Sequence, residues 1–524
     1  MSCLVSLQIH VGHVGHIGHI GHIGHVGHIG HFVFTNNIIT PHNIAIKKTI
    51  KKFDQISFEA IYTYKQKICL IKKMTSIEIV TAFTNKNFVI GKDNRLPWSI
   101  NADMRHFAEI TNGGVVIMGR KTYESLGEEP LKGRINIVVT SKPQKDNNVM
   151  FVTIDEIDNC ITHFKRVFII GGANLYKYFM GKADIIHATV IQDNGDITGD
   201  TFFPTDHFHM YKINEVSERQ ANGYYRFITY KKTDADHDEF KYIDTLDYIM
   251  KHGEPRPDRT GVGTISIFGH QMKFDISTSI PIMTTKFVGF NSILKELLWF
   301  WRGETDSKTL EKENVNIWMG NTSEEFLKSR NLPYERGDLG PMYGHALRSF
   351  GSEYEKCDDN YKGKGFDQIA NLLHNLKTDP YSRRHVLTTF NPAVIDQCVL
   401  MPCHGIAIQF YVSSMRGLSC HVYNRSQDMI LGWPYNATSY AILTHLIAKL
   451  CGMVPDKLII SIGDAHIYNS HFDQANQQME RNPIPYPLLK ISDNVLEENH
   501  IPCLEDFEIM GYLYHPSIRA DMAI

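Results

Sequence analysis

Residues 114–122 read Gly-Val-Val-Ile-Met-Gly-Arg-Lys-Thr, a β-branched run that ends at a glycine and continues into a basic, helix-like segment. Similar runs recur at 135–139 (Ile-Asn-Ile-Val-Val) and 167–170 (Val-Phe-Ile-Ile), with helix-like sequence between them. Short apolar strands that alternate with helices are typical of an α/β layer on a parallel sheet. We therefore predict an α/β domain over residues 74–232, with a mostly parallel central sheet and flanking helices.

A polar, charged stretch at residues 233–239 follows this domain and predicts a short linker. The six residues from Asp234 to Glu239, fully extended, reach only about 20 Å, so the two flanking domains must stay close. Beyond the linker the pattern is mixed, with an alternating strand at 264–275 and helix-like segments at 242–250, 291–301 and 437–451. Mixed order of this kind predicts an α+β domain over residues 240–524.

The first 73 residues fit neither pattern. Residues 10–31 repeat His-Val/Ile-Gly with a period of three, which places eight histidines in a segment without a helix or strand period. We predict a disordered low-complexity extension, in which imidazoles can collect zinc or nickel, more often adventitiously than for a function. Residues 32–73 hold eight lysines, two acids and no arginine, so they do not support organelle targeting.

The overall composition excludes several classes of protein. A net charge of -3 and a pI near 6.8 give no electrostatic footprint for DNA, RNA or an anionic membrane. No apolar run approaches the ~20 residues that span a bilayer. Nine cysteines without paired spacing indicate reduced thiols in a reducing compartment. We expect a soluble cytoplasmic protein without a nucleic-acid or membrane partner and without a metal site.

The first candidate site residue is Asp103, five residues after Trp98 in the helix-like segment 102–110, with Phe107 one turn further on. A carboxylate at the mouth of an apolar pocket can bind an amidine-like edge by two parallel hydrogen bonds and help to deliver a proton. Alone, Asp103 would be an ordinary solvated residue at a helix start. The spacing to the two aromatic residues makes it a candidate acid.

Three segments at strand ends suit a phosphorylated cofactor. Gly119-Arg120-Lys121-Thr122 combines a helix start with two cations, and Thr140-Ser141 adds hydroxyl donors after the next strand. Gly171-Gly172 opens a helix through Tyr176, where bare backbone can approach a ligand. A glycine pair alone is more often a plain turn, so a generic nucleotide-binding α/β domain is the alternative.

In this order the motifs resemble the dihydrofolate reductases. The resemblance implies that Asp103 is the sole acid of the site, that Phe107 packs on the folate, that Arg134 binds the folate α-carboxylate and that Thr189 orients the acid. It implies NADPH as cofactor, with Arg120 suited to its extra phosphate. The implied NADPH residues are Gly119, Arg120, Lys121, Thr122, Thr140, Ser141, Gly171, Gly172 and Tyr176.

The second half centres on Cys403, in Met401-Pro402-Cys403-His404-Gly405. Most cysteines are buried structural thiols. A nucleophilic cysteine needs positive charge nearby to lower its pKa, and Arg425 in Asn424-Arg425-Ser426-Gln427-Asp428 is the candidate. Glu296 lies on an apolar helix pattern, where a carboxylate is unfavourable unless it has a role.

These residues resemble thymidylate synthase. The resemblance implies that Cys403 adds to C6 of dUMP, so that C5 attacks the methylene group of 5,10-methylenetetrahydrofolate. Glu296 would act in a water-linked proton relay, and Tyr343 would lie near the C5 proton. The implied dUMP residues are Arg259, Arg425, Ser426, Asn436, His466 and Tyr468, with Arg383 and Arg384 from the other subunit of a homodimer. The implied folate residues are Trp318, Asp428 and Ile524, the last in a C-terminal lid.

Asn436 distinguishes the pyrimidine base. An amide can donate to the uracil 4-carbonyl and accept from N3–H, whereas a carboxylate would prefer the 4-amino group of cytosine. Asn436 therefore favours dUMP over dCMP. Three positions depart from the family pattern: His345-Ala346-Leu347 where a bulky Trp is usual, Met401 in place of a proline, and Phe390 in place of a Trp.

Together the two sets resemble the bifunctional dihydrofolate reductase–thymidylate synthases of protozoa over roughly residues 74–524. The resemblance implies a homodimer formed through the synthase domains, in which dihydrofolate from the synthase is reduced by the reductase with NADPH. Two other functions remain open. One is a hydroxymethylase fused to a reductase, and the other is a binding protein that keeps the scaffold without catalysis.

Overall fold

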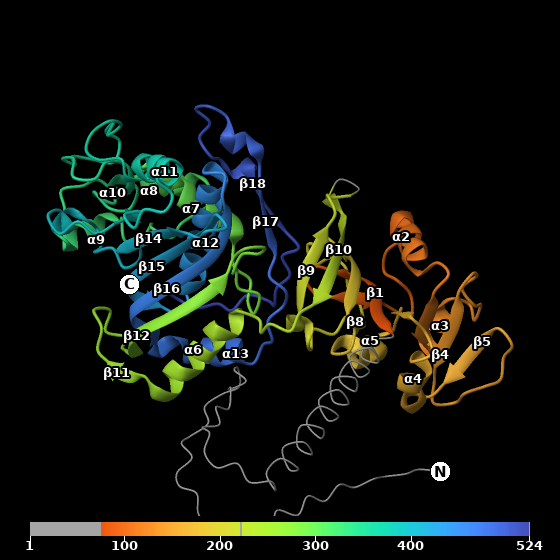
Figure 1. The fold of residues 1–524 in the computed structure, drawn as a ribbon. Helices are drawn as coiled ribbons and strands as arrows, with labels where there is room; N and C mark the ends of the chain where they lie inside the picture. Colours follow the sequence, from red (N-terminus) through yellow and green to blue (C-terminus); the bar gives the residue numbers. More distant parts are fainter. Residues whose placement is uncertain (1–74, 221–222, 523–524) are drawn as a thin grey trace, which may run out of the picture. The chain divides into compact units, whose positions relative to one another are not determined.

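A computed structural model describes residues 75–220 and 223–522 (Figure 1). The extension predicted at residues 1–73 and the predicted folate residue Ile524 lie outside the described residues. Among the described helices, none is both long and apolar enough to cross a membrane.

The first half of the described chain is built on an eight-stranded sheet in the order β5-β4-β3-β6-β1-β7-β10-β9. The strands are β1 (Ser76–Thr84), β3 (Val115–Gly119), β4 (Ile135–Val139), β5 (Val149–Val152), β6 (Arg166–Ile169), β7 (Ile185–Ile191), β9 (Tyr211–Val216) and β10 (Tyr225–Lys232). All pairs from β5 to β7 are parallel, and only β10 and β9 join antiparallel. The prediction of a mostly parallel sheet is confirmed.

The central strands are apolar on both faces. Val115, Val116, Ile117 and Met118 of β3 are each no more than 5% exposed. A parallel strand covered on both faces carries a continuous apolar run, because helices pack on either side. The helices of this half are α2 (Asn101–Thr111), α3 (Arg120–Ser125), α4 (Ile154–Ile161) and α5 (Ala173–Met180); the short elements are β2 (Val89–Gly91), β8 (Thr201–Phe202) and η1 (Phe208–Met210).

The second half has a six-stranded sheet in the order β11-β12-β16-β15-β14-β13. These are β11 (Glu254–Arg256), β12 (Thr264–Asp275), β13 (Val386–Leu387), β14 (Ala407–Val412), β15 (Gly417–Asp428) and β16 (Val454–Tyr468). Only β15 and β16 pair in parallel. Strand β12 has the predicted bounds, and the predicted helices correspond to α6 (Glu239–His252), α7 (Phe290–Arg302) and α12 (Gly432–Leu450).

The core of this half lies where α6, α7 and α12 meet the sheet. Trp299 and Trp433 are fully buried, and the ring of Tyr242 stacks on Trp433 at 4.7 Å. The remaining elements are α8 (Ser307–Lys312), α9 (Glu324–Ser329), α10 (Gly344–Arg348), α11 (Gln368–Thr378), α13 (Phe472–Met479), β17 (Leu488–Ile491), β18 (Phe507–Met510), η3 (Ile395–Gln397), η4 (Asn469–His471), η5 (Asp493–Leu496) and η6 (Leu504–Asp506).

The last residue of the predicted linker is part of the second domain's core. Glu239 begins α6 and is fully buried. Its carboxylate accepts hydrogen bonds from the backbone N–H and the hydroxyl of both Thr284 and Thr285, at 2.6–3.0 Å. The sequence predicts a linker residue, but the structure places Glu239 in the core, where four donors satisfy its carboxylate.

We expect Glu239→Ala to lower the stability of the second domain by about 3 kcal/mol or more. The substitution leaves the Thr284 and Thr285 donors buried without an acceptor, and each such group costs about 1–3 kcal/mol. Differential scanning calorimetry of the variant measures the loss as a lower unfolding midpoint. Glu254→Ala, at an exposed glutamate of β11, is the matched control. Equal midpoints for the two variants would contradict the role of Glu239.

Candidate active sites

The first candidate site is organised around a buried carboxyl group. Asp103 lies in the first turn of α2 and is 8% exposed. The hydroxyl of Thr189, on β7, donates to Asp103 Oδ1 at 2.6 Å. Burial raises the pKa of Asp103, although the Thr189 hydrogen bond acts in the opposite direction. A carboxyl group in this setting keeps its proton to higher pH than a solvated aspartate and can act as an acid.

One turn beyond Asp103, Phe107 of α2 lies beside Arg134, which directly precedes β4. Arg134 donates from Nη1 to the hydroxyl of Thr111 at 2.7 Å, and its guanidinium lies 5.7 Å from the ring centre of Phe107. The indole N–H of Trp98 is buried and has no hydrogen-bond partner within the described residues. An acid, a cation and an apolar ring therefore share one region, as binding of a carboxylate-bearing heterocycle would require.

The two glycine segments predicted for a cofactor are joined directly. The backbone N–H of Gly119 donates to the Gly171 carbonyl at 2.8 Å. Gly171 has φ of 127°, a conformation that residues with a side chain rarely adopt, and a Cβ there would lie 3.2 Å from the hydroxyl oxygen of Thr122. Glycine at this position therefore lets the backbone at the starts of α3 and α5 lie close together, with Gly171 itself buried.

The side chains predicted to bind the cofactor around these glycines differ in their solvent exposure and in the contacts that they already make. Lys121 and Ser141 are exposed, and Thr140 is buried. Arg120 is half-exposed and forms an ion pair with Glu124 one turn along α3. Tyr176 belongs to the core: its hydroxyl donates to the Val80 carbonyl at 3.0 Å, and only 5% of its surface remains for a cofactor.

The second candidate site surrounds Cys403. Its sulfur lies 3.7 Å from the hydroxyl oxygen of Tyr343, and its backbone N–H donates to that oxygen at 3.3 Å. Arg425, on β15, donates to the carbonyls of Pro402 and Met401 at 3.4 and 3.3 Å. Strand β15 therefore holds the loop that presents the thiol.

The predicted lowering of the Cys403 pKa is wrong. Burial raises the pKa of the thiol, and this outweighs the lowering by the Tyr343 hydrogen bond and the Arg425 charge. The sequence indicates the Arg425 charge, which lowers the pKa of the thiol. It does not indicate the burial of Cys403, which raises that pKa by a larger amount.

Tyr343 has an unusual backbone and a fixed ring. Its φ and ψ are 38° and -90°, and the side chain is 3% exposed. The ring stacks on His404 at 4.6 Å, and His404 Nδ1 lies 2.7 Å from the hydroxyl of Tyr440. Burial lowers the pKa of His404 to about 4, so this imidazole is neutral at neutral pH. Tyr440, 37 residues after Cys403, was not predicted.

The departure at His345 is accommodated by local packing. His345 is 3% exposed, and its Nε2 lies 3.0 Å from the Ser352 hydroxyl. The rings of Tyr354 and Tyr361 meet it edge-on at 5.0 and 4.8 Å. The imidazole is therefore enclosed by two tyrosines.

Glu296 lies on α7 near the same tyrosine. Its Oε1 accepts a hydrogen bond from the indole N–H of Trp318 at 2.8 Å, and the Trp318 and Tyr343 rings are 5.9 Å apart. Burial raises the pKa of Glu296 to about 7. A carboxyl group with this pKa can both hold and release a proton at neutral pH, so it suits general acid–base work.

A network of side-chain amides connects the Cys403 loop to Asn436, the residue predicted to distinguish the pyrimidine base. Asn436 and Asn424 both donate to Gln427 Oε1, at 3.3 and 2.8 Å, and Asn424 Oδ1 accepts from the Gly405 N–H at 3.1 Å. Gly405 has φ of 65°, and a Cβ there would lie 2.4 Å from the Tyr440 hydroxyl. Asn424 and Gln427 were not predicted, and their only sequence signal is their place beside Arg425.

The remaining predicted residues lie around this centre on β15 and β16. Ser426 and Asp428 pair with Asp464 and His466 across the parallel register. His466 Nδ1 lies 3.0 Å from Asp464 Oδ1, and its ring meets Tyr468 edge-on at 5.2 Å. Asp428 Oδ1 accepts from the N–H groups of Ile430 and Leu431 at 2.8 and 3.2 Å.

Three predicted arginines are solvent-exposed: Arg259, Arg383 and Arg384. Within residues 75–220 and 223–522, Arg383 and Arg384 form no side-chain hydrogen bond or ion pair. Their charges are therefore available to another molecule.

Comparison with known proteins agrees with this division. A family model described as Dihydrofolate reductase matches residues 76–232, and one described as Thymidylate synthase matches residues 240–524. The chain is 38% identical to a bifunctional dihydrofolate reductase-thymidylate synthase of Paramecium tetraurelia, over 83% of this chain and 96% of that protein. It is 34% identical to the protein of that name from Zea mays, over 85% of this chain and 96% of that protein. It is 32% identical to the protein of that name from Plasmodium chabaudi, over 86% of this chain and 97% of that protein.

Proposed function

The chain belongs to the family of bifunctional dihydrofolate reductase–thymidylate synthases, and we propose how its residues divide the two reactions between two sites. It is an enzyme that makes dTMP from dUMP with 5,10-methylenetetrahydrofolate and reduces dihydrofolate with NADPH. We assign the reductase to residues 74–232 and the synthase to residues 240–524, with the linker between them.

In the synthase site, the sulfur of Cys403 forms a bond to C6 of dUMP, which makes C5 a nucleophile toward the folate methylene group. The contact between its sulfur and the Tyr343 hydroxyl supports a role for this tyrosine near the C5 proton. Glu296, with a pKa of about 7, takes up or gives back the proton that the pyrimidine ring of dUMP exchanges during the reaction. Arg425, Ser426 and Arg259 bind the nucleotide phosphate, and His466 and Tyr468 bind the ribose.

In the reductase site, Asp103 binds the amidine-like edge of the pterin and helps to deliver a proton, while bound NADPH supplies the hydride. Phe107 packs on the folate, and Arg134 binds its α-carboxylate. The Thr189 hydroxyl fixes the orientation of Asp103, which the hydrogen bond of 2.6 Å supports.

One observation carries the proposal: each region has its own carboxyl group held by a second predicted site residue, Asp103 by the Thr189 hydroxyl and Glu296 by the Trp318 indole N–H. Burial raises the pKa of both carboxyl groups. The test is an assay of the purified protein with dUMP, methylenetetrahydrofolate and NADPH. We expect dTMP to form and NADPH to be consumed. NADPH loss with added dihydrofolate, but no dTMP from dUMP, would overturn the synthase assignment. Hydroxymethylation of dCMP would favour the alternative enzyme.

Asn436→Asp is expected to change the preference for the base. The carboxylate leaves the uracil 4-carbonyl without its donor and accepts from the 4-amino group of cytosine, so kcat/KM for dUMP should fall by about 10²-fold or more while dCMP becomes a competitor. Steady-state kinetics on both nucleotides measure the switch. Asn360→Asp, at an exposed asparagine, is the control. An unchanged preference would exclude Asn436 from the base pocket.

We also propose a cytoplasmic homodimer formed through the synthase domains. All seven cysteines within the described residues are free, which supports a reducing compartment. The exposed and unpaired Arg383 and Arg384 support a role in the partner subunit's phosphate site.

Mixing two inactive variants tests the shared site. Cys403→Ala and Arg384→Ala chains, each poorly active alone, should regain about one quarter of wild-type synthase activity when refolded together, because half of randomly formed dimers are mixed and each has one intact site. The dTMP assay measures the recovery, and the reductase rate should not change. No recovery, although mixed dimers are shown to form, would mean that Arg384 acts within its own chain.

A further inference from the structure

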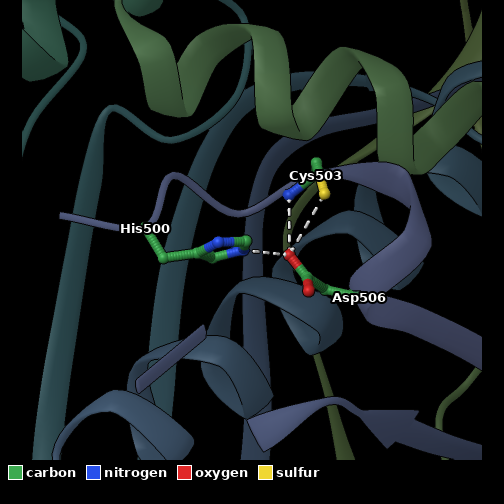
Figure 2. A group of neighbouring side chains, drawn as sticks. All are labelled: His500, Cys503 and Asp506. Atoms are coloured by element: carbon green, nitrogen blue, oxygen red, sulfur yellow. Dashed lines mark hydrogen bonds and ion pairs between the residues drawn. The ribbon is translucent and has the colours of Figure 1, made fainter. Parts of the chain in front are cut away.

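Three potential metal ligands converge outside both sites, in the segment between η5 and β18. His500, Cys503 and Asp506 follow one another at intervals of three residues (Figure 2). One ligand atom from each, a ring nitrogen, a sulfur and a carboxylate oxygen, lies within 4.8 Å of the other two. Asp506 is 3% exposed, and the His500 side chain keeps 24% of its surface open to solvent.

All three groups meet at one oxygen. Asp506 Oδ2 lies 2.7 Å from His500 Nε2 and 3.4 Å from Cys503 Sγ, and it accepts from the Cys503 backbone N–H at 2.9 Å. The backbone contact caps η6 and does not need the other two side chains. His500 Nε2 and Cys503 Sγ therefore both point at the buried Asp506 carboxylate. These two atoms are the ones that bind a metal once they have lost their protons.

We propose that His500, Cys503 and Asp506 form a zinc site, with water as the fourth ligand. Tetrahedral zinc with ordinary bond lengths separates sulfur and oxygen ligands by about 3.5 Å, and nitrogen and oxygen ligands by about 3.3 Å. The observed sulfur–oxygen distance of 3.4 Å fits that geometry. The nitrogen–oxygen distance of 2.7 Å must open by about 0.6 Å, and the partly exposed imidazole has room to move.

The ligand types select the metal. A thiolate with an imidazole and a carboxylate suits zinc, whereas magnesium and calcium prefer oxygen ligands alone. Element η6 contacts α7, the helix that carries Glu296. Zinc would therefore brace the segment 500–506 against a helix of the synthase site, as a structural ion and without a part in either reaction.

Cobalt(II) is the probe for this site, because its charge-transfer absorption with a thiolate identifies a cysteine ligand. The full chain is titrated with cobalt(II), and zinc is then added in competition. Imidazole is a metal ligand, so the histidine-rich segment 10–31 is kept the same in every protein that is compared. The wild-type protein is compared with Cys503→Ser and His500→Gln, which leave that segment intact. Both replacements keep a polar group, and both activities serve as the check that each variant is folded. Cys160→Ser, at a partly exposed cysteine elsewhere, is the matched control.

We expect a thiolate–cobalt band in the wild-type protein and in Cys160→Ser that is lost in Cys503→Ser and weakened in His500→Gln. Zinc should abolish the band, and metal analysis after dialysis should find about one ion fewer per chain in Cys503→Ser. Zinc should also raise the unfolding midpoint of the wild-type protein more than that of Cys503→Ser. A band that persists in Cys503→Ser, or equal metal content in both proteins, would overturn the site.

Discussion

Cys403→Ala is expected to abolish dTMP formation while leaving dihydrofolate reduction unchanged. Without the sulfur there is no bond to C6 of dUMP, so C5 is not activated and the synthase rate should fall by at least about 10⁴-fold. The reductase site has its own acid, Asp103, and does not depend on this thiol. Formation of dTMP and oxidation of NADPH with added dihydrofolate, measured on the same preparation, separate the two effects.

Cys398→Ala is the matched control, because this buried cysteine lies five residues before Cys403 and contacts the Val394 carbonyl. It should keep both activities. Loss of both activities in a folded Cys403→Ala protein would contradict the division into two separate sites.

Asp103→Asn should have the opposite effect, with NADPH oxidation reduced by about 10²–10⁴-fold and dTMP synthesis retained. The amide can still accept the Thr189 hydrogen bond, so the fold of the pocket is kept while the acid is lost. The control is Asp155→Asn, at an exposed aspartate in the first turn of α4.

The pH dependence provides a second measurement on the same variant. Because burial raises the pKa of Asp103, the protonated form persists above the pH at which a solvated aspartate ionises, and the wild-type rate should fall as pH rises through that raised pKa. Asp103→Asn should lack this decline. A decline of equal size in both proteins would assign it to another group.

The elements were predictable where a single pattern dominated. The parallel strands were visible because both faces are covered, and β12 because its alternation is long. The predicted helix 437–451 begins five residues after the start of α12, because Gly432-Trp433-Pro434 is typical of a break. Proline is nevertheless tolerated in the first turn of a helix. Glu239 was misplaced because its four hydrogen-bond donors lie 45 and 46 residues away.

The same contrast holds for the sites. Asp103, Glu296 and Cys403 are conspicuous because their types are reactive or out of place in their segments. Asn424, Gln427 and Tyr440 are neutral polar residues within ordinary strand and helix patterns, and only long-range contacts reveal them. The direction of the Cys403 pKa shift depends on burial, which no local pattern records.

The backbone of Tyr343 has a consequence for the evolution and engineering of this enzyme. A non-glycine residue at φ of 38° and ψ of -90° costs on the order of 1–3 kcal/mol, and glycine would relieve most of it. Yet only a tyrosine brings a hydroxyl to Cys403 and a ring to His404. Loss of the buried ring would cost about 3–5 kcal/mol, which is more than the strain that glycine relieves. Selection for stability therefore retains an aromatic ring at this strained position, and selection for turnover adds only the hydroxyl, so Tyr343→Phe would separate the two.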